Sequence, residues 1–339
     1  MDLKEIREQA KEKLKGFCRV CPVCDGRACA GEVPGMGGVG TGRAFQENLK
    51  ALARYKLNLR AIHAVREPIL ESELFGIKVS MPVFVAPITG TTYNMGGALT
   101  EEQYALAVVE GSRLAGTLAF TGDGADPTMY GSGLKAIQKE HGQGIPVIKP
   151  RAQEEIIKRI KEAEEVGAIA VGMDIDGAGL LTMALKGQPV SPKTFTEIKE
   201  LVDSTTLPFI LKGIMTPDEA ELAVEAGVKA IVVSNHGGRV LDETPGAAEV
   251  LPEIAARVKG KVTILADGGV RSGVDVLKLL ALGADGVLIG RPLIVAAFGG
   301  GALGVKVYLE KIAKELREAM LLTGVATVKG VPATVIWKG

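Results

Sequence analysis

The 339-residue sequence has no net charge, because 40 lysines and arginines are balanced by 40 aspartates and glutamates. A chain without net charge has no overall attraction for nucleic acid or an anionic membrane, so neither is expected as a partner. We find no apolar run that is long and uncharged enough to suggest a membrane span. The opening residues, Met1 to Arg7, are charged and lack the apolar region of a signal peptide. These absences predict a soluble cytoplasmic protein.

Cysteine is scarce, and its four copies lie in one short stretch. Cys18, Cys21, Cys24 and Cys29 have the spacing C-x2-C-x2-C-x4-C. In a cytosolic protein such a cluster favours a metal over disulfides. The spacing is close to that of ferredoxins, although the last interval is one residue longer and no proline follows Cys29. An iron–sulfur cluster, a structural zinc ion and a set of free thiols in a small hydrophobic corner all stay open.

From Met81 onward, short apolar runs alternate with helical patterns. The apolar runs are strand candidates at residues 82–88, 117–121, 145–149, 168–174, 207–213, 229–234, 262–267 and 286–290. Between them lie amphipathic patterns, among them residues 100–115, 152–166, 217–226 and 273–282. Alternation of this kind predicts an α/β fold, a (β/α)8 TIM barrel with its active groups at the carboxyl ends of the strands. The spacing alone does not exclude an open doubly wound sheet.

The first 80 residues form a separate segment in this prediction. Helices are expected at residues 2–16 and 43–57, on either side of the cysteines, and residues 59–80 are expected to lead to the barrel mouth as irregular chain or short strands. We therefore divide the chain into an N-terminal helical and Cys-rich segment, residues 1–80, and a barrel, residues 81–339.

Two further stretches have weaker patterns. Gly35 to Gly40 fits G-x-G-x-x-G, but a Cys-rich loop precedes it where a dinucleotide site needs a strand, so we expect a loop that covers a ligand. Near the carboxyl end, an amphipathic helix at residues 305–322 and an apolar tail at residues 331–337 are candidates for a subunit interface.

A polar cluster directly follows the sixth apolar run. Ala230 to Val233 are apolar, and Ser234-Asn235-His236-Gly237-Gly238-Arg239 comes next. The glycines allow a sharp turn and a close approach to a ligand. An imidazole and a guanidinium three residues apart suit the binding of a small anionic substrate and the removal of a proton from it.

This stretch closely resembles the FMN-dependent α-hydroxy-acid dehydrogenase/oxidase family, which includes glycolate oxidase and lactate oxidase. That family has Ser-Asn-His-Gly-Gly-Arg and then Leu-Asp at its sixth barrel strand, here Ser234 to Arg239 and Leu241-Asp242. The resemblance implies a closed barrel, an FMN cofactor, oxidation of a small 2-hydroxy acid to a 2-oxo acid, and a homotetramer or larger assembly. It also implies that His236 is the base and that Arg239 binds the substrate carboxylate.

Further motifs extend the resemblance in the same order. Lys212 matches the family lysine that stabilises the reduced flavin, Asp267 to Arg271 match Asp-Gly-Gly-Val-Arg, and Gly290-Arg291-Pro292 matches Gly-Arg-Pro. A generic sugar-phosphate barrel would explain the glycines but not Lys212, His236 and Arg239. The implied FMN-binding residues are Pro87, Ile88, Thr89, Lys149, Lys212, Ser234, Asp267, Gly268, Gly269, Arg271, Gly290 and Arg291.

The middle of the barrel departs from the family. Lys149 and Arg151 stand where the family has a glutamine and a tyrosine, residues 17–30 contain no tyrosine, and the family's second substrate arginine has no counterpart in residues 177–181. Asp174 keeps the family's aspartate on the fourth strand. We expect Arg151 to replace the missing carboxylate clamp.

Two other functions stay open. A flavin-dependent isomerase of the isopentenyl-diphosphate type would use Lys149 and Arg151 to bind a diphosphate, although the Asn-His-Gly-Gly-Arg motif at residues 235–239 argues against this function. A non-catalytic flavin-binding or metal-binding sensor would use the cysteine segment.

Overall fold

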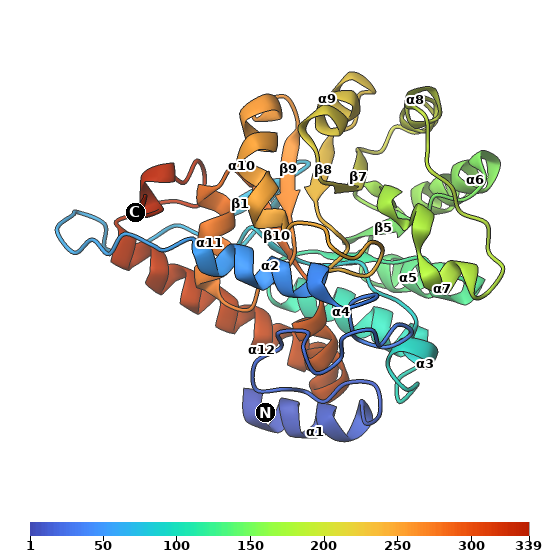
Figure 1. The fold of residues 1–339 in the computed structure, drawn as a ribbon, viewed down its shortest axis with the longest axis horizontal. Helices are drawn as coiled ribbons and strands as arrows, with labels where there is room; N and C mark the ends of the chain where they lie inside the picture. Colours follow the sequence, from blue (N-terminus) through green and yellow to red (C-terminus); the bar gives the residue numbers. More distant parts are fainter. Residues whose placement is uncertain (339) are drawn as a thin grey trace.

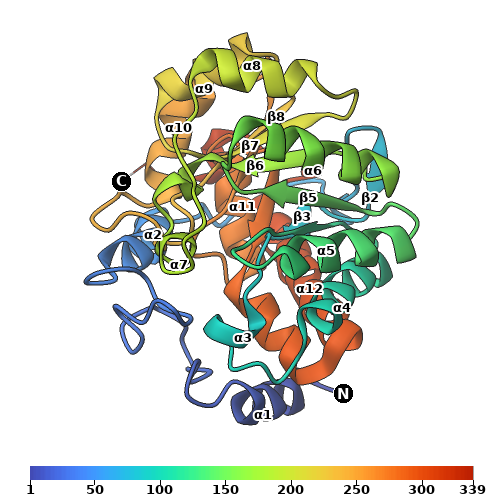
Figure 2. The same cartoon turned by 90° about the vertical axis from the view of Figure 1, so that its right-hand side faces the viewer.

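A computed structural model describes residues 1–338, and its centre is a closed barrel of eight parallel strands (Figures 1 and 2). The strands are β3 (Val83–Val85), β4 (Ala119–Thr121), β5 (Gly144–Ile148), β6 (Val171–Asp174), β7 (Phe209–Ile214), β8 (Ala230–Val233), β9 (Thr263–Ala266) and β10 (Gly286–Ile289). Their order around the barrel follows the chain, and β10 closes against β3. Each predicted apolar run overlaps one strand, so the (β/α)8 barrel is confirmed and the open sheet is not formed.

The strands are apolar along their whole length because both of their faces are buried. In β8 every residue is buried. Ile231 and Val233 pack in the large cluster between barrel and helices, whereas Ala230 and Val232 belong to the cluster that fills the barrel interior. A strand with two covered faces has no position for a polar side chain until it ends, which is where the functional groups begin.

Helices surround the barrel. They are α3 (Thr91–Asn94), α4 (Glu101–Leu114), α5 (Pro127–Lys139), α6 (Gln153–Glu165), α7 (Leu181–Ala184), α8 (Phe195–Asp203), α9 (Pro217–Glu225), α10 (Ala247–Val258), α11 (Gly273–Ala281) and α12 (Arg291–Thr323), with short 3-10 helices η1 (Ile175–Gly179) and η2 (Ala333–Val335). Thr100, Thr194 and Ser272 begin α4, α8 and α11 with reciprocal capping boxes, which satisfy the first free backbone N–H groups. The helices predicted at residues 100–115, 152–166, 217–226 and 273–282 are α4, α6, α9 and α11.

The N-terminal segment packs on the barrel at three places. Helix α1 (Leu3–Lys13) lies against α12, and α2 (Arg43–Arg54) lies against α10 (Figure 1). Strands β1 (Ser72–Leu74) and β2 (Ile77–Val79) form an antiparallel hairpin. The hairpin packs into the interior cluster, and Ser80 after it bonds to Gly116, which precedes β4. The prediction that this stretch leads to the barrel mouth is therefore wrong: the hairpin covers the amino-terminal end, while the division at residue 80 stays a prediction.

Helix α12 is the longest element, and it is broken at Gly301, whose φ of 58° and ψ of −145° are not helical. Among residues 1–338 it is the one helix long and apolar enough to cross a membrane by length and composition, and half of its apolar 18-residue window is buried inside the protein. The sequence-based expectation that no apolar run is long enough to span a membrane is therefore wrong for residues 291–323. The broken axis and the packing against α1, α4 and α11 give α12 a place in the globular core.

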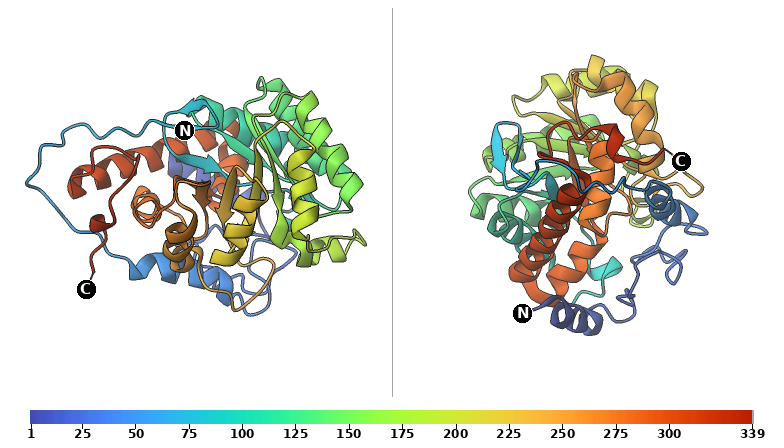
Figure 3. Two further views of the ribbon diagram at one scale, coloured as in Figure 1. Left: turned by 90° about the horizontal axis from the view of Figure 1, so that it is seen from above. Right: turned by 90° about the vertical axis from the view of Figure 1, so that its left-hand side faces the viewer.

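The C-terminal tail pairs with the segment that follows α2, as two neighbouring extended segments in Figure 3. Leu57 bridges Ile336, and the Trp337 N–H donates to the Lys56 carbonyl at 2.8 Å. The Trp337 ring itself stays 58% exposed. A contribution of this tail to a subunit interface stays a prediction.

Candidate active site

The carboxyl ends of the barrel strands open into a cavity with an empty volume of about 1070 Å³. All but two of the predicted site residues line it: Pro87, Ile88, Thr89, Lys149, Lys212, His236, Arg239, Asp267, Gly268, Gly269, Arg271, Gly290 and Arg291. The fold therefore gathers motifs from distant parts of the sequence at one barrel end, as parallel strands require.

His236 lies in the turn after β8 with a φ of 57°, a left-handed conformation that is uncommon outside glycine. Its Nδ1 is 2.9 Å from Asp176 Oδ1, and its backbone N–H donates to Ser234 Oγ at 3.0 Å. Burial lowers the pKa of His236 below its ordinary 6.5, although the Asp176 carboxylate opposes that shift. A neutral imidazole that donates from Nδ1 to Asp176 keeps the Nε2 lone pair available as a base.

A buried group of charges lies beside this pair. Asp174 accepts from Lys149 Nζ at 2.6 Å and lies 3.1 Å from Lys212 Nζ, while Asp267 lies 3.9 Å from the same ammonium. Burial by itself lowers the pKa of Lys212, but the two carboxylates outweigh it and raise the pKa above 10.5. Lys212 is therefore a fixed positive charge on the cavity wall, held by Asp174.

Several features of the wall fit a flavin mononucleotide. Lys212 offers a cation for a ring that gains negative charge on reduction. Asp267 Oδ1 is buried and has no hydrogen-bond partner within residues 1–338, which fits an acceptor for a ribityl hydroxyl. Gly269 has a φ of 80°, and a Cβ there would lie 2.9 Å from the Asn48 backbone. This turn, with Arg271 and Arg291 on the same wall, suits a phosphate.

The family model described as FMN-dependent dehydrogenase matches residues 35–194 and 181–338. The chain belongs to the FMN-dependent dehydrogenase family. The 2-hydroxyacid oxidase of Dictyostelium discoideum is 33% identical over 326 residues, which cover 86% of this chain and 81% of that protein. The L-lactate dehydrogenase of Serratia proteamaculans is 30% identical over 89% of this chain and 93% of its own length. A solved structure of mandelate oxidase with benzoyl-formic acid superposes with a TM-score of 0.79, 30% identity and coverage of 99% and 97%.

These relatives decide between the functions left open by the sequence. They make the protein an oxidoreductase with FMN as its cofactor, and they favour neither an isomerase nor a non-catalytic sensor. The matched region begins at residue 35, so the cysteine segment lies outside it.

Two arginines hold a loop at the edge of the cavity. Arg239 donates to the carbonyls of Gly35 and Gly37 at 2.7 and 3.1 Å, and Arg291 donates to the carbonyl of Met36 at 2.7 Å. Burial lowers the pKa of Arg239 to about 10 and that of Arg291 to about 9. The expected ligand-covering loop at residues 35–40 therefore does border the cavity, since Gly35 and Met36 line its wall.

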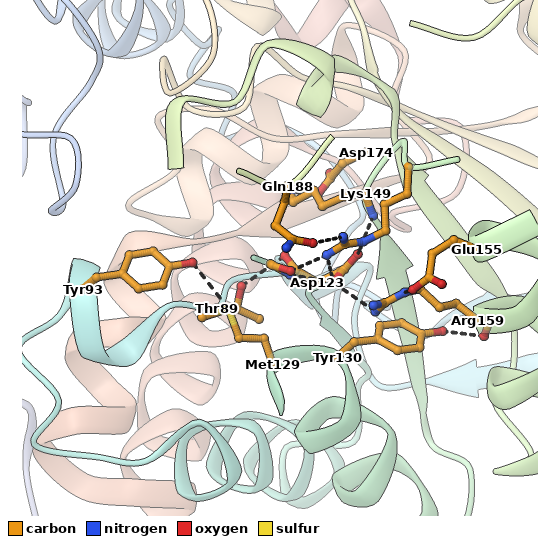
Figure 4. A network of polar contacts seen from close by, with 12 residues as sticks. Thr89, Tyr93, Asp123, Met129, Tyr130, Lys149, Glu155, Arg159, Asp174 and Gln188 are labelled. Carbon is orange, nitrogen blue, oxygen red and sulfur yellow. Dashed lines mark hydrogen bonds and ion pairs between the residues drawn. The ribbon is translucent and has the colours of Figure 1, made fainter. Parts of the chain in front are cut away.

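Two predicted residues do not line the cavity. Ser234 is fully buried, and its hydroxyl fixes the backbone of His236. Arg151 turns to Asp123 at 2.9 Å and to Gln188 at 2.9 Å. Figure 4 shows Asp123 at the centre of this network, with Arg159 also bound to it at 3.1 Å. The binding of a substrate carboxylate by Arg151 stays a prediction. In this structure the Asp123 carboxylate neutralises the charge of Arg151.

Three functional candidates escaped the sequence analysis. Asp176, and not Asp174, is the partner of His236, although the pair of aspartates two residues apart after β6 was a visible signal. Tyr93 lines the cavity from α3, the short helix after β3, and brings to it a phenol that residues 17–30 lack; burial raises its pKa to about 12. Asp123 also lines the cavity, and no pattern in the sequence pointed to it.

Proposed function

We propose that this protein oxidises a small 2-hydroxy acid to the corresponding 2-oxo acid. The observation that supports this most directly is the neutral His236, held by Asp176 at 2.9 Å in the same cavity as Lys212 and Arg239. When bound, FMN supplies the acceptor for the two electrons of the reaction. Lys212, Asp267, Gly268, Gly269, Arg271, Gly290 and Arg291 are the residues that would hold it.

The residues of this chain have distinct tasks in the proposal. Arg239 binds the substrate carboxylate, because a guanidinium matches a carboxylate with two parallel donors. His236 Nε2 takes the proton of the substrate hydroxyl, and the Asp176 carboxylate stabilises the imidazolium that forms. Lys212 keeps its positive charge throughout, since its pKa lies above 10.5. Tyr93 is a further hydrogen-bond donor toward the substrate.

Anaerobic addition of lactate, glycolate and longer 2-hydroxy acids to the purified flavoprotein tests the proposal. We expect at least one of them to bleach the flavin absorbance. His236→Asn should slow this bleaching roughly 10²–10⁴-fold. His141→Asn is the matched control, because both histidines have a φ of 57°, a conformation that asparagine tolerates.

The outcomes separate clearly. His141 is exposed, so its variant should bleach at the wild-type rate. Bleaching by none of the acids, or bleaching of His236→Asn at the wild-type rate, would contradict the proposal.

We further propose a cytoplasmic location and a homotetramer or larger assembly. Within residues 1–338 none of the four cysteines forms a disulfide, as expected in a reducing compartment. Exposed apolar side chains on α12 and the tail, Leu303, Leu322 and Trp337, offer a surface for self-association. Light scattering of the purified protein measures the assembly.

A further inference from the structure

The four cysteines line a second cavity beside the active site, with an empty volume of about 1330 Å³. They lie on the loop between α1 and α2, the dark blue segment of Figure 1. Met36, Arg271 and Arg291 line both cavities. The four thiols therefore border one shared cavity, next to the arginines of the flavin site.

We propose that Cys18, Cys21, Cys24 and Cys29 bind an iron–sulfur cluster of the four-iron cubane type. A single zinc ion has Zn–S bonds of about 2.3 Å, which place four tetrahedral sulfurs about 3.8 Å apart. Within residues 1–338 no three cysteine sulfurs lie within 4.8 Å of one another, yet all four border one cavity. A cubane gives each thiolate its own iron and so requires the wider spread.

The charges around the cavity suit a cluster with bound thiolates. Such a cluster is anionic, and its stability and potential depend on nearby positive charges and on hydrogen bonds to sulfur. Arg271 Nη2 lies 3.5 Å from Cys24 Sγ, and the Val20 N–H donates to Cys18 Sγ at 3.4 Å. Arg7 binds the Cys21 carbonyl at 2.7 Å. These contacts place a donor at two of the four sulfurs, Cys18 and Cys24, and a further cation, Arg7, at the backbone of the same loop.

The position of the cluster next to the flavin site suits it for electron transfer. This role rests on the proposed function. Oxidation of one 2-hydroxy acid releases two electrons and two protons. The cluster accepts the electrons one at a time and passes each to an external one-electron acceptor, such as a small iron–sulfur protein, while the protons go to solvent. The segment before residue 35, which lies outside the family match, thus adds an electron exit to the barrel.

The test uses the full chain, purified without oxygen and reconstituted with ferrous iron and sulfide. We expect about four irons and four acid-labile sulfides per chain, and an electron paramagnetic resonance signal after reduction with dithionite. One zinc per chain, or no metal, would overturn the proposal.

Two variants of neighbouring residues test the ligands. Cys24→Ala should lose the iron and the signal, with flavin absorbance as the measure of a folded barrel. Val23→Ala is the matched control, because Val23 is 68% exposed on the same loop, and it should keep both. Equal iron content in the two variants would exclude Cys24 as a ligand.

The electron exit has a separate readout. Adding the 2-hydroxy acid to anaerobic wild-type protein should produce the signal that dithionite produces. If dithionite produces the signal but the substrate bleaches the flavin without producing it, electron transfer through the cluster is contradicted. The presence of the cluster is then still supported. If the substrate does not bleach the flavin, the proposed function fails, whereas the iron and sulfide content is measured without substrate.

Discussion

Charged groups that follow β7 to β10 face the active-site cavity, whereas those that follow β4 to β6 mostly bind one another. On the first side, Asp267 keeps a buried oxygen without a partner and His236 keeps a free ring nitrogen. On the second side, Asp123 is shared by Arg151 and Arg159, and Asp174 is shared by Lys149 and Lys212.

The difference separates groups that are available to bind a ligand from groups that stabilise the cavity wall through internal ion pairs. Buried charges need compensation within the fold, because an isolated charge in the interior is very costly. The second side supplies this compensation with its own ion pairs. On the first side Arg239 and Arg291 bind backbone carbonyls of residues 35–37, whereas Asp267 and His236 each keep an atom free for cofactor or substrate. Asp176 links the two sides, since it follows β6 but serves His236 after β8.

The largest expected effect comes from breaking the second side at its centre. Asp123→Asn leaves Arg151 and Arg159 buried without their carboxylate, so we expect a loss of about 3–5 kcal/mol in the free energy of unfolding. Urea denaturation measures it. Glu155→Gln is the control, because it removes the other partner of Arg159 at a site 41% exposed, where pairs contribute about 0.2–1 kcal/mol. Equal losses would show that the network does not stabilise the wall.

Next, Asp176→Asn tests the link between the sides. We expect kcat/KM to fall about 10²-fold, because His236 loses the group that orients it and stabilises its charge. The base is active when neutral, so the wild-type rate should fall as pH drops through the His236 pKa, below 6.5.

Because the Asp176 carboxylate raises that pKa, its removal should move this acid limb to still lower pH. Asp203→Asn, at an exposed aspartate 61% accessible, should leave the profile unchanged. A lower rate with an unmoved limb would argue against the pairing with His236.

On the first side, Gly269→Ala should cost more than Gly260→Ala. Both glycines have left-handed φ angles, 80° and 82°, but a Cβ at Gly269 meets the Asn48 backbone at 2.9 Å and one at Gly260 meets nothing within 4 Å. The shared conformational cost is about 1–2 kcal/mol, and the clash adds to it. The flavin content per chain and the urea midpoint are measured for both variants. Equal values would show that the close approach between Gly269 and Asn48 has no effect on flavin binding or stability.

The smallest expected effect is that of Tyr93→Phe, at the boundary between the two sides. Loss of one hydroxyl contact costs about 0.5–1.5 kcal/mol, so KM should rise roughly two- to tenfold with little change in stability. Steady-state kinetics measure it beside Tyr55→Phe, a tyrosine at the end of α2. An unchanged KM would place Tyr93 outside the substrate contacts.

The cofactor side of the cavity was predictable because its motifs are contiguous. Asp267 to Arg271 and Ser234 to Arg239 each follow a buried strand directly, so the end of the apolar run already places them at the barrel mouth. The other side was not predictable in the same way. Whether Arg151 faces the cavity depends on Asp123, 28 residues earlier, and no local pattern reports that pairing.

The sequence by itself determined the alternation of strands and helices and the places where the strands end, because burial on both faces of a strand and short turns after it are local properties of the chain. The closed barrel and the flavin-binding motifs were expected from the resemblance to the FMN-dependent family. Only the tertiary structure decided that Asp176 binds His236, that Arg151 is neutralised by Asp123, and that the cysteine loop lies behind Arg271 and Arg291. Each of these contacts joins segments brought together by barrel closure and helix packing, and long-range packing of this kind is set by the shape of the whole fold.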